Sequence, residues 1–221
     1  MRTSVNRSEQ LDLQEYDTDK VRNGYLRWYD DLFNDTYDRV KAVLELGVHR
    51  GGSLELWRDY FPAARIVGID TDISAVRCAD PRIEFFQGRQ DDERFLQEIA
   101  RRAAPDGFDL IIDDASHIGA LTEATFRALY DAHLKPGGFY VIEDWGTGYL
   151  PDWPDGKKMR SRRPPMRSRS RLAHFLGVKL PIHSHLYGLV GFIKRLVDEQ
   201  GQGRFAQMTI TSGLVALRKP G

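Results

Sequence analysis

The chain has 221 residues, of which 41% are hydrophobic and 29% are charged, a composition typical of globular proteins. Its 32 basic and 32 acidic residues cancel, so the net charge provides no argument for a nucleic-acid or membrane-surface partner. The single cysteine, Cys78, excludes an internal disulfide, and no signal peptide is recognisable, which together predict a cytoplasmic protein. No window approaches the roughly 18 apolar residues that a transmembrane helix needs.

The N-terminal segment, residues 1–40, is predicted to be helical from Thr18 onward. Apolar and aromatic side chains recur there at helical spacing, namely Val21, Tyr25, Trp28, Tyr29, Leu32, Phe33 and Tyr37. This pattern predicts one or two amphipathic helices with an aromatic face. Such a face is typical of packing against a core, and it is also a candidate surface for a homodimer.

Residues 41–221 are predicted to form the main domain, in which strands and helices alternate. Strands are expected at 43–46, 66–69, 83–86, 108–112 and 139–142, and helices at 53–60, 92–103 and 118–133, the last closed by Lys135-Pro136-Gly137-Gly138. This alternation predicts a doubly wound α/β fold, with a mostly parallel sheet covered on both faces. Ligands in such folds bind at the carboxyl ends of the strands.

Residues 145–182 interrupt the alternation and are predicted to be an insertion rich in Gly, Pro and Arg. Within it, residues 157–171 contain eight basic residues and no acid. This stretch could be a solvated loop, a lid over the substrate or a clamp for nucleic acid, and its lack of interleaved aromatic residues disfavours the last. A helix at 186–197 and strands at 205–211 and 214–218 follow. A terminal antiparallel hairpin of this kind is typical of the methyltransferase variant of the fold.

The segment VLELGVHRGGS reads as a strand, a glycine-rich turn and the start of a helix. Gly47 permits a sharp turn, Gly51 and Gly52 permit close approach of the backbone to a ligand, and Ser53 can cap the helix. The segment does not match the G-x-G-x-x-G fingerprint of dinucleotide-binding proteins. Glu45, inside the strand, suits a cationic amino group better than a pyrophosphate.

Further candidates for nucleoside binding follow the second and third strands. Asp70 ends the second strand, 23 residues after Gly47, where an acid can accept hydrogen bonds from ribose hydroxyls. The same acid would also serve NAD, or could be a loop or cap carboxylate. Gln90 or Asp92 could contact the adenine edge, and Asp92 is equally suited to cap the next helix.

Two acidic pairs follow neighbouring strands, Asp113-Asp114 and Glu143-Asp144. Carboxylates gathered at adjacent strand ends repel one another unless a cation or a ligand amine lies among them. All-oxygen ligation favours Mg²⁺, Mn²⁺ or Ca²⁺, although solvated loop carboxylates and caps remain the alternative. His117, near a helix start beside these acids, is the candidate general base.

Together, the segments TDKVRNGYLRWYDDLF, LELGVHRGGS, VGIDTD, FDLIIDDASH and LKPGGFYVIED resemble bacterial metal-dependent sugar O-methyltransferases. These include enzymes of the macrolide and mycinamicin type and a mycobacterial enzyme that methylates a mannoside precursor of methylmannose polysaccharides. The resemblance covers roughly residues 18–144 and implies a class I fold that binds S-adenosylmethionine and Mg²⁺. The chain departs from many relatives at Ala115, where they have glycine, and at Arg89, where they have an acid.

The resemblance also implies roles for individual residues. It assigns Mg²⁺ to Asp114, Glu143 and Asp144, proton abstraction to His117, and contacts with the cofactor to Glu45, Gly47, Ser53, Asp70 and Asp113. The implied reaction is methylation of a sugar hydroxyl in a small glycoside or oligosaccharide, with a mannoside of polysaccharide biosynthesis as one candidate. Alternatives are a phenolic or antibiotic hydroxyl, an RNA acceptor, an NAD-dependent oxidoreductase and a catalytically silent cofactor-binding protein.

Overall fold

The computed structural model describes residues 5–162 and 186–221. Its strands are β1 (Ala42–Leu46), β2 (Arg65–Asp70), β3 (Ile83–Gln87), β4 (Phe108–Asp113), β5 (Leu134–Glu143), β6 (Gln207–Ile210) and β7 (Leu214–Arg218). Its α-helices are α1 (Asp19–Arg22), α2 (Leu26–Phe33), α3 (Gly52–Tyr60), α4 (Glu93–Ala103), α5 (Gly119–His133), α6 (Pro154–Arg162) and α8 (Gly188–Gly201). Short 3-10 helices cover Ser8–Gln10, Leu13–Glu15 and Trp145–Tyr149.

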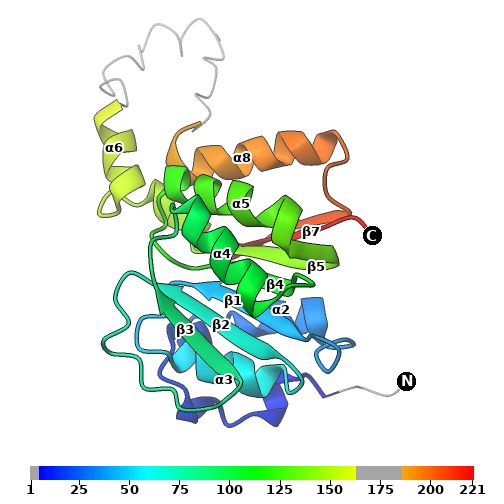
Figure 1. Ribbon diagram of the computed structural model, residues 1–221. Coiled ribbons are helices and arrows are strands. Elements are labelled where there is room, and N and C mark those ends of the chain that lie inside the picture. The colour runs from blue at the N-terminus through cyan, green and yellow to red at the C-terminus, as the bar shows by residue number, and fades with distance from the viewer. Residues whose placement is uncertain (1–4, 163–185) are drawn as a thin grey trace, which may run out of the picture.

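The strands form one sheet in the order β3-β2-β1-β4-β5-β7-β6 (Figure 1). Strands β1 to β5 pair in parallel, whereas β7 pairs antiparallel with both β5 and β6. The predicted doubly wound sheet with a terminal antiparallel hairpin is therefore confirmed. The strand order reverses between β1 and β4, which is where an open α/β sheet offers a binding crevice.

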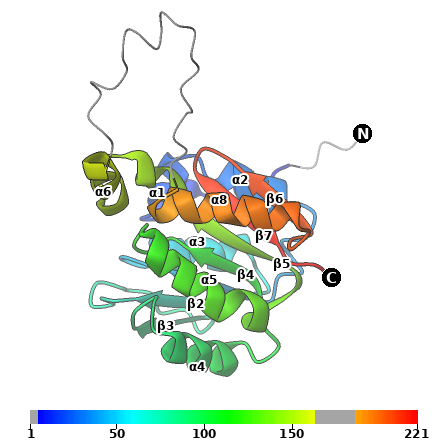
Figure 2. The same cartoon turned by 90° about the horizontal axis from the view of Figure 1, so that it is seen from above.

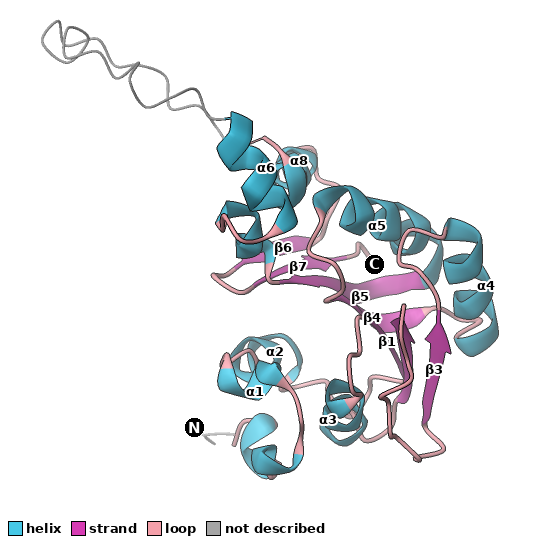
Figure 3. Cartoon of the chain, turned by 90° about the vertical axis from the view of Figure 1, so that its left-hand side faces the viewer, coloured by secondary structure: helices cyan, strands magenta, loops and turns pink. Residues whose placement is uncertain are grey.

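Helices cover both faces of the sheet (Figure 3). One face carries α4, α5 and α8, and the other carries α1, α2 and α3. The aromatic face predicted for the N-terminal segment lies against the second face, where Tyr29 and Phe33 are buried with Trp57 of α3. Each such side chain contributes about 1.5–3 kcal/mol by leaving water. The N-terminal segment thus shares a core with the sheet, while the division into residues 1–40 and 41–221 stays a prediction.

Strand β5 begins earlier than predicted. Leu134 already pairs with Phe108, and the register shifts between that pair and Phe139 opposite Leu110. The Lys135-Pro136-Gly137-Gly138 stretch therefore lies inside an irregular strand and does not form a separate turn. Gly137, at φ 76°, accommodates the irregularity.

The predicted insertion at 145–182 contains more regular structure than its composition indicated. The 3-10 helix Trp145–Tyr149 is followed by α6, which starts at Pro154 and carries Asp155 in its first turn. Proline at the first helical position and an acid close behind it are helix-start signals that the prediction overlooked. Of the basic stretch 157–171, residues 163–171 lie outside the described residues, so its role stays a prediction. No helix in the described ranges is long and apolar enough to cross a membrane.

Candidate active site

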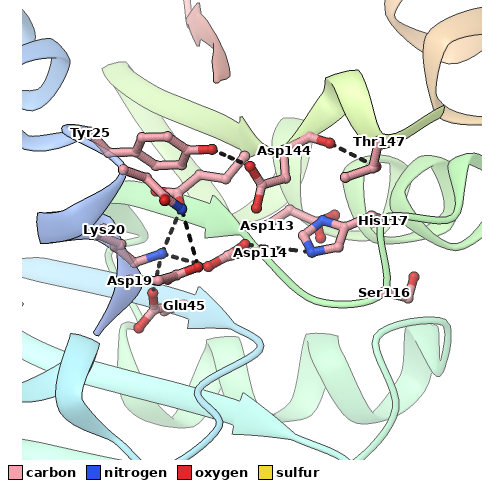
Figure 4. A network of polar contacts seen from close by, with 12 residues as sticks. Asp19, Lys20, Tyr25, Glu45, Asp113, Asp114, Ser116, His117, Asp144 and Thr147 are labelled. Carbon is pink, nitrogen blue, oxygen red and sulfur yellow. Dashed lines mark hydrogen bonds and ion pairs between the residues drawn. The ribbon is translucent and has the colours of Figure 1, made fainter. Parts of the chain in front are cut away.

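The polar residues of interest gather beyond the carboxyl ends of β1, β4 and β5, where Figure 2 shows α1 and α6 at the same end of the molecule. Side chains alternate between the two faces of a strand. Glu45 and Glu143 share the face of Val43 and Val141, which is the face covered by the N-terminal segment. Asp114 also points to that side, because it contacts the same lysine as Glu45 and Glu143 (Figure 4).

Asp113 does not join these acids. Its carboxylate accepts hydrogen bonds from Gln90 Nε2 at 3.2 Å and from Tyr140 Oη at 3.3 Å, among the side chains of the opposite face. Burial raises the pKa of Asp113 to about 7. The expectation that two complete acidic pairs converge is therefore wrong for this residue. Its predicted contact with a cofactor stays a prediction.

Lys20 of α1 lies among the remaining acids. Its Nζ is 2.6 Å from Asp114 Oδ2, 2.6 Å from Glu143 Oε2 and 3.2 Å from Glu45 Oε1, and its side chain is 1% exposed. Burial acts to lower the pKa of Lys20, but the three carboxylates raise it well above its usual value. Part of the positive charge that this acidic cluster requires is therefore provided by the ammonium group of Lys20. Sequence reasoning missed this residue.

Two tyrosines of the N-terminal segment contact the second acidic pair. The Tyr25 hydroxyl donates a hydrogen bond to Asp144 Oδ1, and the Tyr29 hydroxyl donates one to Glu143 Oε1. Both were predicted only as members of an aromatic packing face. The overlooked signal is that tyrosine, unlike phenylalanine, needs a hydrogen-bond partner when it is buried.

Asp114, His117 and Asp144 converge from two loops (Figure 4). Each offers one ligand atom, and these atoms lie within 4.8 Å of one another. His117 Nε2 is 3.9 Å from Asp114 Oδ1. His117 and Asp144 both have left-handed backbones, at φ 53° and φ 52°, a strained conformation that is enriched at functional sites. The Trp153 ring meets the His117 ring edge-on, with centroids 5.1 Å apart.

The charge and chemistry of this cluster fit a divalent cation. One ammonium group, that of Lys20, faces the carboxylates of Glu45, Asp114 and Glu143, and Asp144 adds another acid beside them. Oxygen-rich donor sets of this kind suit Mg²⁺ or Mn²⁺. Of the three predicted ligands, Asp114 and Asp144 belong to the converging set. Glu143 lies next to it, bonded to Lys20 and Tyr29, and its role as a ligand stays a prediction.

The glycine-rich loop lies directly beside this cluster. Gly47 has φ 87°, and a Cβ added to it would overlap the backbone carbonyl of Asp114. Asp70 Oδ2 accepts hydrogen bonds from the backbone N–H groups of Val48 at 2.8 Å and His49 at 3.0 Å. The predicted cofactor residues Gly47 and Asp70 are therefore adjacent, at the carboxyl ends of β1 and β2.

One local expectation for the loops was wrong, the capping role of Ser53. Ser53 does not cap α3, whose N-cap is Gly51, and the Ser53 hydroxyl instead donates to Glu45 Oε2 at 2.6 Å. Gly52 makes its close approach to the backbone of Asp17. Glu45 contacts the amino group of Lys20 and the hydroxyl of Ser53. The contacts predicted between the cofactor and Glu45 or Ser53 stay predictions.

The two adenine candidates have partners within the protein. Asp92 caps α4 by accepting from Phe95 N at 3.1 Å, which was one of its two predicted roles. Gln90 is buried, and its Oε1 accepts from Ser116 N at 3.0 Å. This hydrogen bond fixes the position of the loop that carries His117. A contact between either side chain and adenine stays a prediction.

No protein-family model matches the chain. Among curated relatives, the chain is 42% identical over 139 residues to mycinamicin VI 2''-O-methyltransferase from Micromonospora griseorubida, covering 58% of this chain and 34% of the relative. It is 39% identical over 141 residues to the 8-demethyl-8-(2-methoxy-alpha-L-rhamnosyl)-tetracenomycin-C 3'-O-methyltransferase from Streptomyces olivaceus, covering 59% and 35%. The chain resembles antibiotic sugar O-methyltransferases. This finding confirms the resemblance seen in the sequence motifs.

Solved structures agree with the sequence relatives. The methyltransferase MycE of the mycinamycin pathway, in complex with Mg, SAH and mycinamycin VI, matches with a TM-score of 0.66 and 32% identity, over 89% of this chain and 49% of that one. A Podospora anserina methyltransferase bound to SAH matches at 17% identity with a TM-score of 0.54, which shows the fold alone. The fold is that of class I S-adenosylmethionine-dependent methyltransferases. The chain spans about a third of the curated relatives and about half of MycE.

Proposed function

We propose that this protein is an S-adenosylmethionine-dependent O-methyltransferase that requires a divalent metal ion and methylates a hydroxyl group on the sugar of a glycosylated small molecule. The observation that supports it best is the convergence of Asp114, His117 and Asp144 beside a glycine-rich loop. The relatives named above, which act on macrolide and tetracenomycin sugars, support the same reaction class.

In this proposal, Gly47 and Asp70 hold the cofactor at the carboxyl ends of β1 and β2. Asp114 and Asp144, with Glu143 as a further predicted ligand, would hold the metal ion, which when bound would supply a Lewis acid for the acceptor oxygen. A sugar hydroxyl is a very weak acid, so a neutral imidazole alone is a poor base for it. His117 accepts the hydroxyl proton at Nε2, the atom 3.9 Å from Asp114 Oδ1.

The acceptor is proposed to bind beside His117, against the exposed ring of Trp153. Trp153 is 37% exposed, and its ring makes a T-shaped contact with the His117 ring. Trp145, by contrast, donates through Nε1 to the Thr211 carbonyl and belongs to the packing of the loop. An exposed aromatic ring beside the base can pack on the apolar face of a sugar, which suits a glycoside acceptor.

The identity of the sugar is the finer part of the proposal. The tetracenomycin relative named above acts on a rhamnosyl sugar, so a deoxysugar of an antibiotic is the first acceptor class to examine. A mannoside of polysaccharide biosynthesis is the second. The two classes differ at the 6-position, where the 6-deoxy sugars lack the hydroxyl group that mannose carries.

The deciding experiment measures S-adenosylhomocysteine formation with rhamnosides, mannosides, other glycosides and catechols, each with Mg²⁺ and with a chelator. Metal-dependent turnover on a glycoside is the expected result. Turnover that ignores the chelator would overturn the metal requirement, and turnover on catechols alone would overturn the sugar acceptor. Absence of S-adenosylmethionine binding by calorimetry would overturn the reaction class.

A further inference from the structure

The N-terminal segment contacts acids of the candidate metal site through side chains that no motif of the site includes. Tyr25 donates to Asp144, and Tyr29 donates to Glu143. These contacts span 119 and 114 residues of sequence, so they depend on how the segment packs across the ends of the strands. A ligand carboxylate with a hydrogen-bonded partner behind it is the usual arrangement at protein metal sites.

We infer that Tyr25 and Tyr29 are positioning residues of the metal site, which orient Asp144 and Glu143 toward the ion. The inference rests on the proposed metal-dependent function. The residues that hold the ligand carboxylates in place would then come from the N-terminal segment, whereas all the predicted ligands come from β4, β5 and the loops that follow them.

The geometry gives each tyrosine the means to fix a carboxylate. Both phenol rings are held in place by neighbouring aromatic rings, Tyr25 by Trp28 at 5.2 Å between centroids and Tyr29 by Trp57 at 4.6 Å. Tyr25 is 7% exposed and Tyr29 is fully buried, so water does not replace their hydroxyls easily. Each hydroxyl binds one carboxylate oxygen and restricts rotation of the group, which favours the orientation that a metal ion requires.

Asp144 depends on such support more than Glu143 does. Glu143 is also held by Lys20 Nζ at 2.6 Å from its other oxygen. Asp144 lies in a left-handed backbone conformation at the end of β5, and its Oδ1 accepts from Tyr25. We therefore expect removal of the Tyr25 hydroxyl to have the larger effect on metal binding.

A matched control is available in the same core. Tyr60 of α3 is fully buried and donates to Asp30 Oδ1 at 2.8 Å, on α2 and away from the metal cluster. Tyr60→Phe therefore removes a hydroxyl–carboxylate bond of the same kind without touching a predicted ligand. Any effect through general stability should appear in this variant as well.

The test is a calorimetric titration with Mg²⁺ alone, and separately with S-adenosylhomocysteine, on the full chain and on Tyr25→Phe, Tyr29→Phe and Tyr60→Phe. Loss of such a partner typically weakens metal binding about 10–100-fold. We expect Tyr25→Phe to weaken Mg²⁺ binding at least about tenfold, Tyr29→Phe to weaken it less, and S-adenosylhomocysteine affinity to stay within about twofold throughout. Tyr60→Phe should bind Mg²⁺ as the unmodified chain does.

Mg²⁺ affinity in Tyr25→Phe equal to that of the unmodified chain would overturn the inference and leave the proposed function standing. Equal weakening in Tyr25→Phe and Tyr60→Phe would also overturn it, because the effect would then be general destabilisation. If the unmodified chain binds S-adenosylhomocysteine but not Mg²⁺, the metal requirement itself fails and the inference fails with it.

Discussion

At the scale of single residues, His117 combines two features that bear on its role. Its backbone is left-handed at φ 53°, and its imidazole lies both within reach of Asp114 and against Trp153. As a base, it would leave the metal and cofactor sites intact when it is removed. If His117 is instead a metal ligand, its removal would also weaken binding of the ion.

We expect His117→Ala to lose about 10²–10⁴-fold in turnover while keeping its affinity for Mg²⁺ and S-adenosylmethionine. Turnover is measured as S-adenosylhomocysteine formation, and both affinities by calorimetry. Near-normal turnover would disprove the assignment as base. A parallel fall in Mg²⁺ affinity would reassign His117 to the metal.

Gly47 is the residue at which the glycine-rich loop contacts the loop that begins at Asp114. Its backbone has a positive φ of 87°, which is unfavourable for any residue with a side chain. A Cβ at this position would also overlap the backbone carbonyl of Asp114. Gly203 has a similar φ of 79° with nothing within 4 Å of an added Cβ, so it isolates the backbone cost. For an L-residue, that conformation costs roughly 1–2 kcal/mol.

Gly203→Ala should therefore lower the free energy of unfolding by about 1–2 kcal/mol in urea denaturation. Gly47→Ala should lose clearly more and should also weaken S-adenosylmethionine binding, because the loop must shift away from Asp114. Equal losses in the two variants would show that the contact between the loops adds nothing to the backbone cost.

At the scale of elements, Asp155 joins three helices at one point. Its Oδ2 accepts from Gly119 N at 2.7 Å and from Leu189 N at 2.8 Å, which are the first turns of α5 and α8. The side chain is 2% exposed. A carboxylate at two helix N-termini satisfies two buried N–H groups and interacts favourably with both helix dipoles.

We expect Asp155→Ala to lower the free energy of unfolding by about 2–5 kcal/mol, since it leaves two buried donors unpaired. Asp155→Asn, which keeps an acceptor oxygen, should lose less. The exposed Asp152 three residues earlier provides the control, and Asp152→Ala should change stability by less than about 0.5 kcal/mol. Chemical denaturation of the three variants measures the order, and a neutral Asp155→Ala would contradict this account of the junction.

Elements whose residues follow a clear period were predictable, and irregular elements were not. The strands β1 to β4 and the helices α3, α4 and α5 match the predictions to within a residue or two, because their apolar patterns report which face is buried. Strand β5 begins five residues early, since pairing of Leu134 with Phe108 overrides the turn preference of Pro and Gly. Helix α6 has little apolar pattern, so the only sequence signals for it are Pro154 and Asp155 at its start, which the prediction did not use.

At the scale of the whole molecule, cofactor binding should stabilise the fold. A ligand at 100 times its Kd adds about 2.7 kcal/mol, which for a chain of this size raises Tm by about 5–10 °C. We expect this shift with S-adenosylhomocysteine in a thermal melt, and none with NAD at the same concentration. The opposite pattern would favour the oxidoreductase alternative.

The site was only partly predictable because it is made from distant parts of the chain. Strand ends placed Glu45, Asp114, Glu143 and Asp144 together, since parallel strands share one carboxyl edge. The two-residue period also separates Asp113 from Asp114, a consequence that the prediction did not use. Lys20 could not have been placed, because nothing local indicates where a short amphipathic helix packs on a sheet.

The contacts of Lys20 also determine when, during synthesis of the chain, the acidic cluster can form. Lys20 leaves the ribosome 94 residues before Asp114 and 123 residues before Glu143. At about 5–20 residues per second, the N-terminal segment waits roughly 6–25 seconds for its last acidic partner. Until β5 is synthesised, Tyr25 and Tyr29 have no carboxylate partner, and Lys20 has only Glu45 and Asp114. The acidic cluster therefore closes late in biogenesis, and slowing translation should leave the segment sensitive to protease for correspondingly longer.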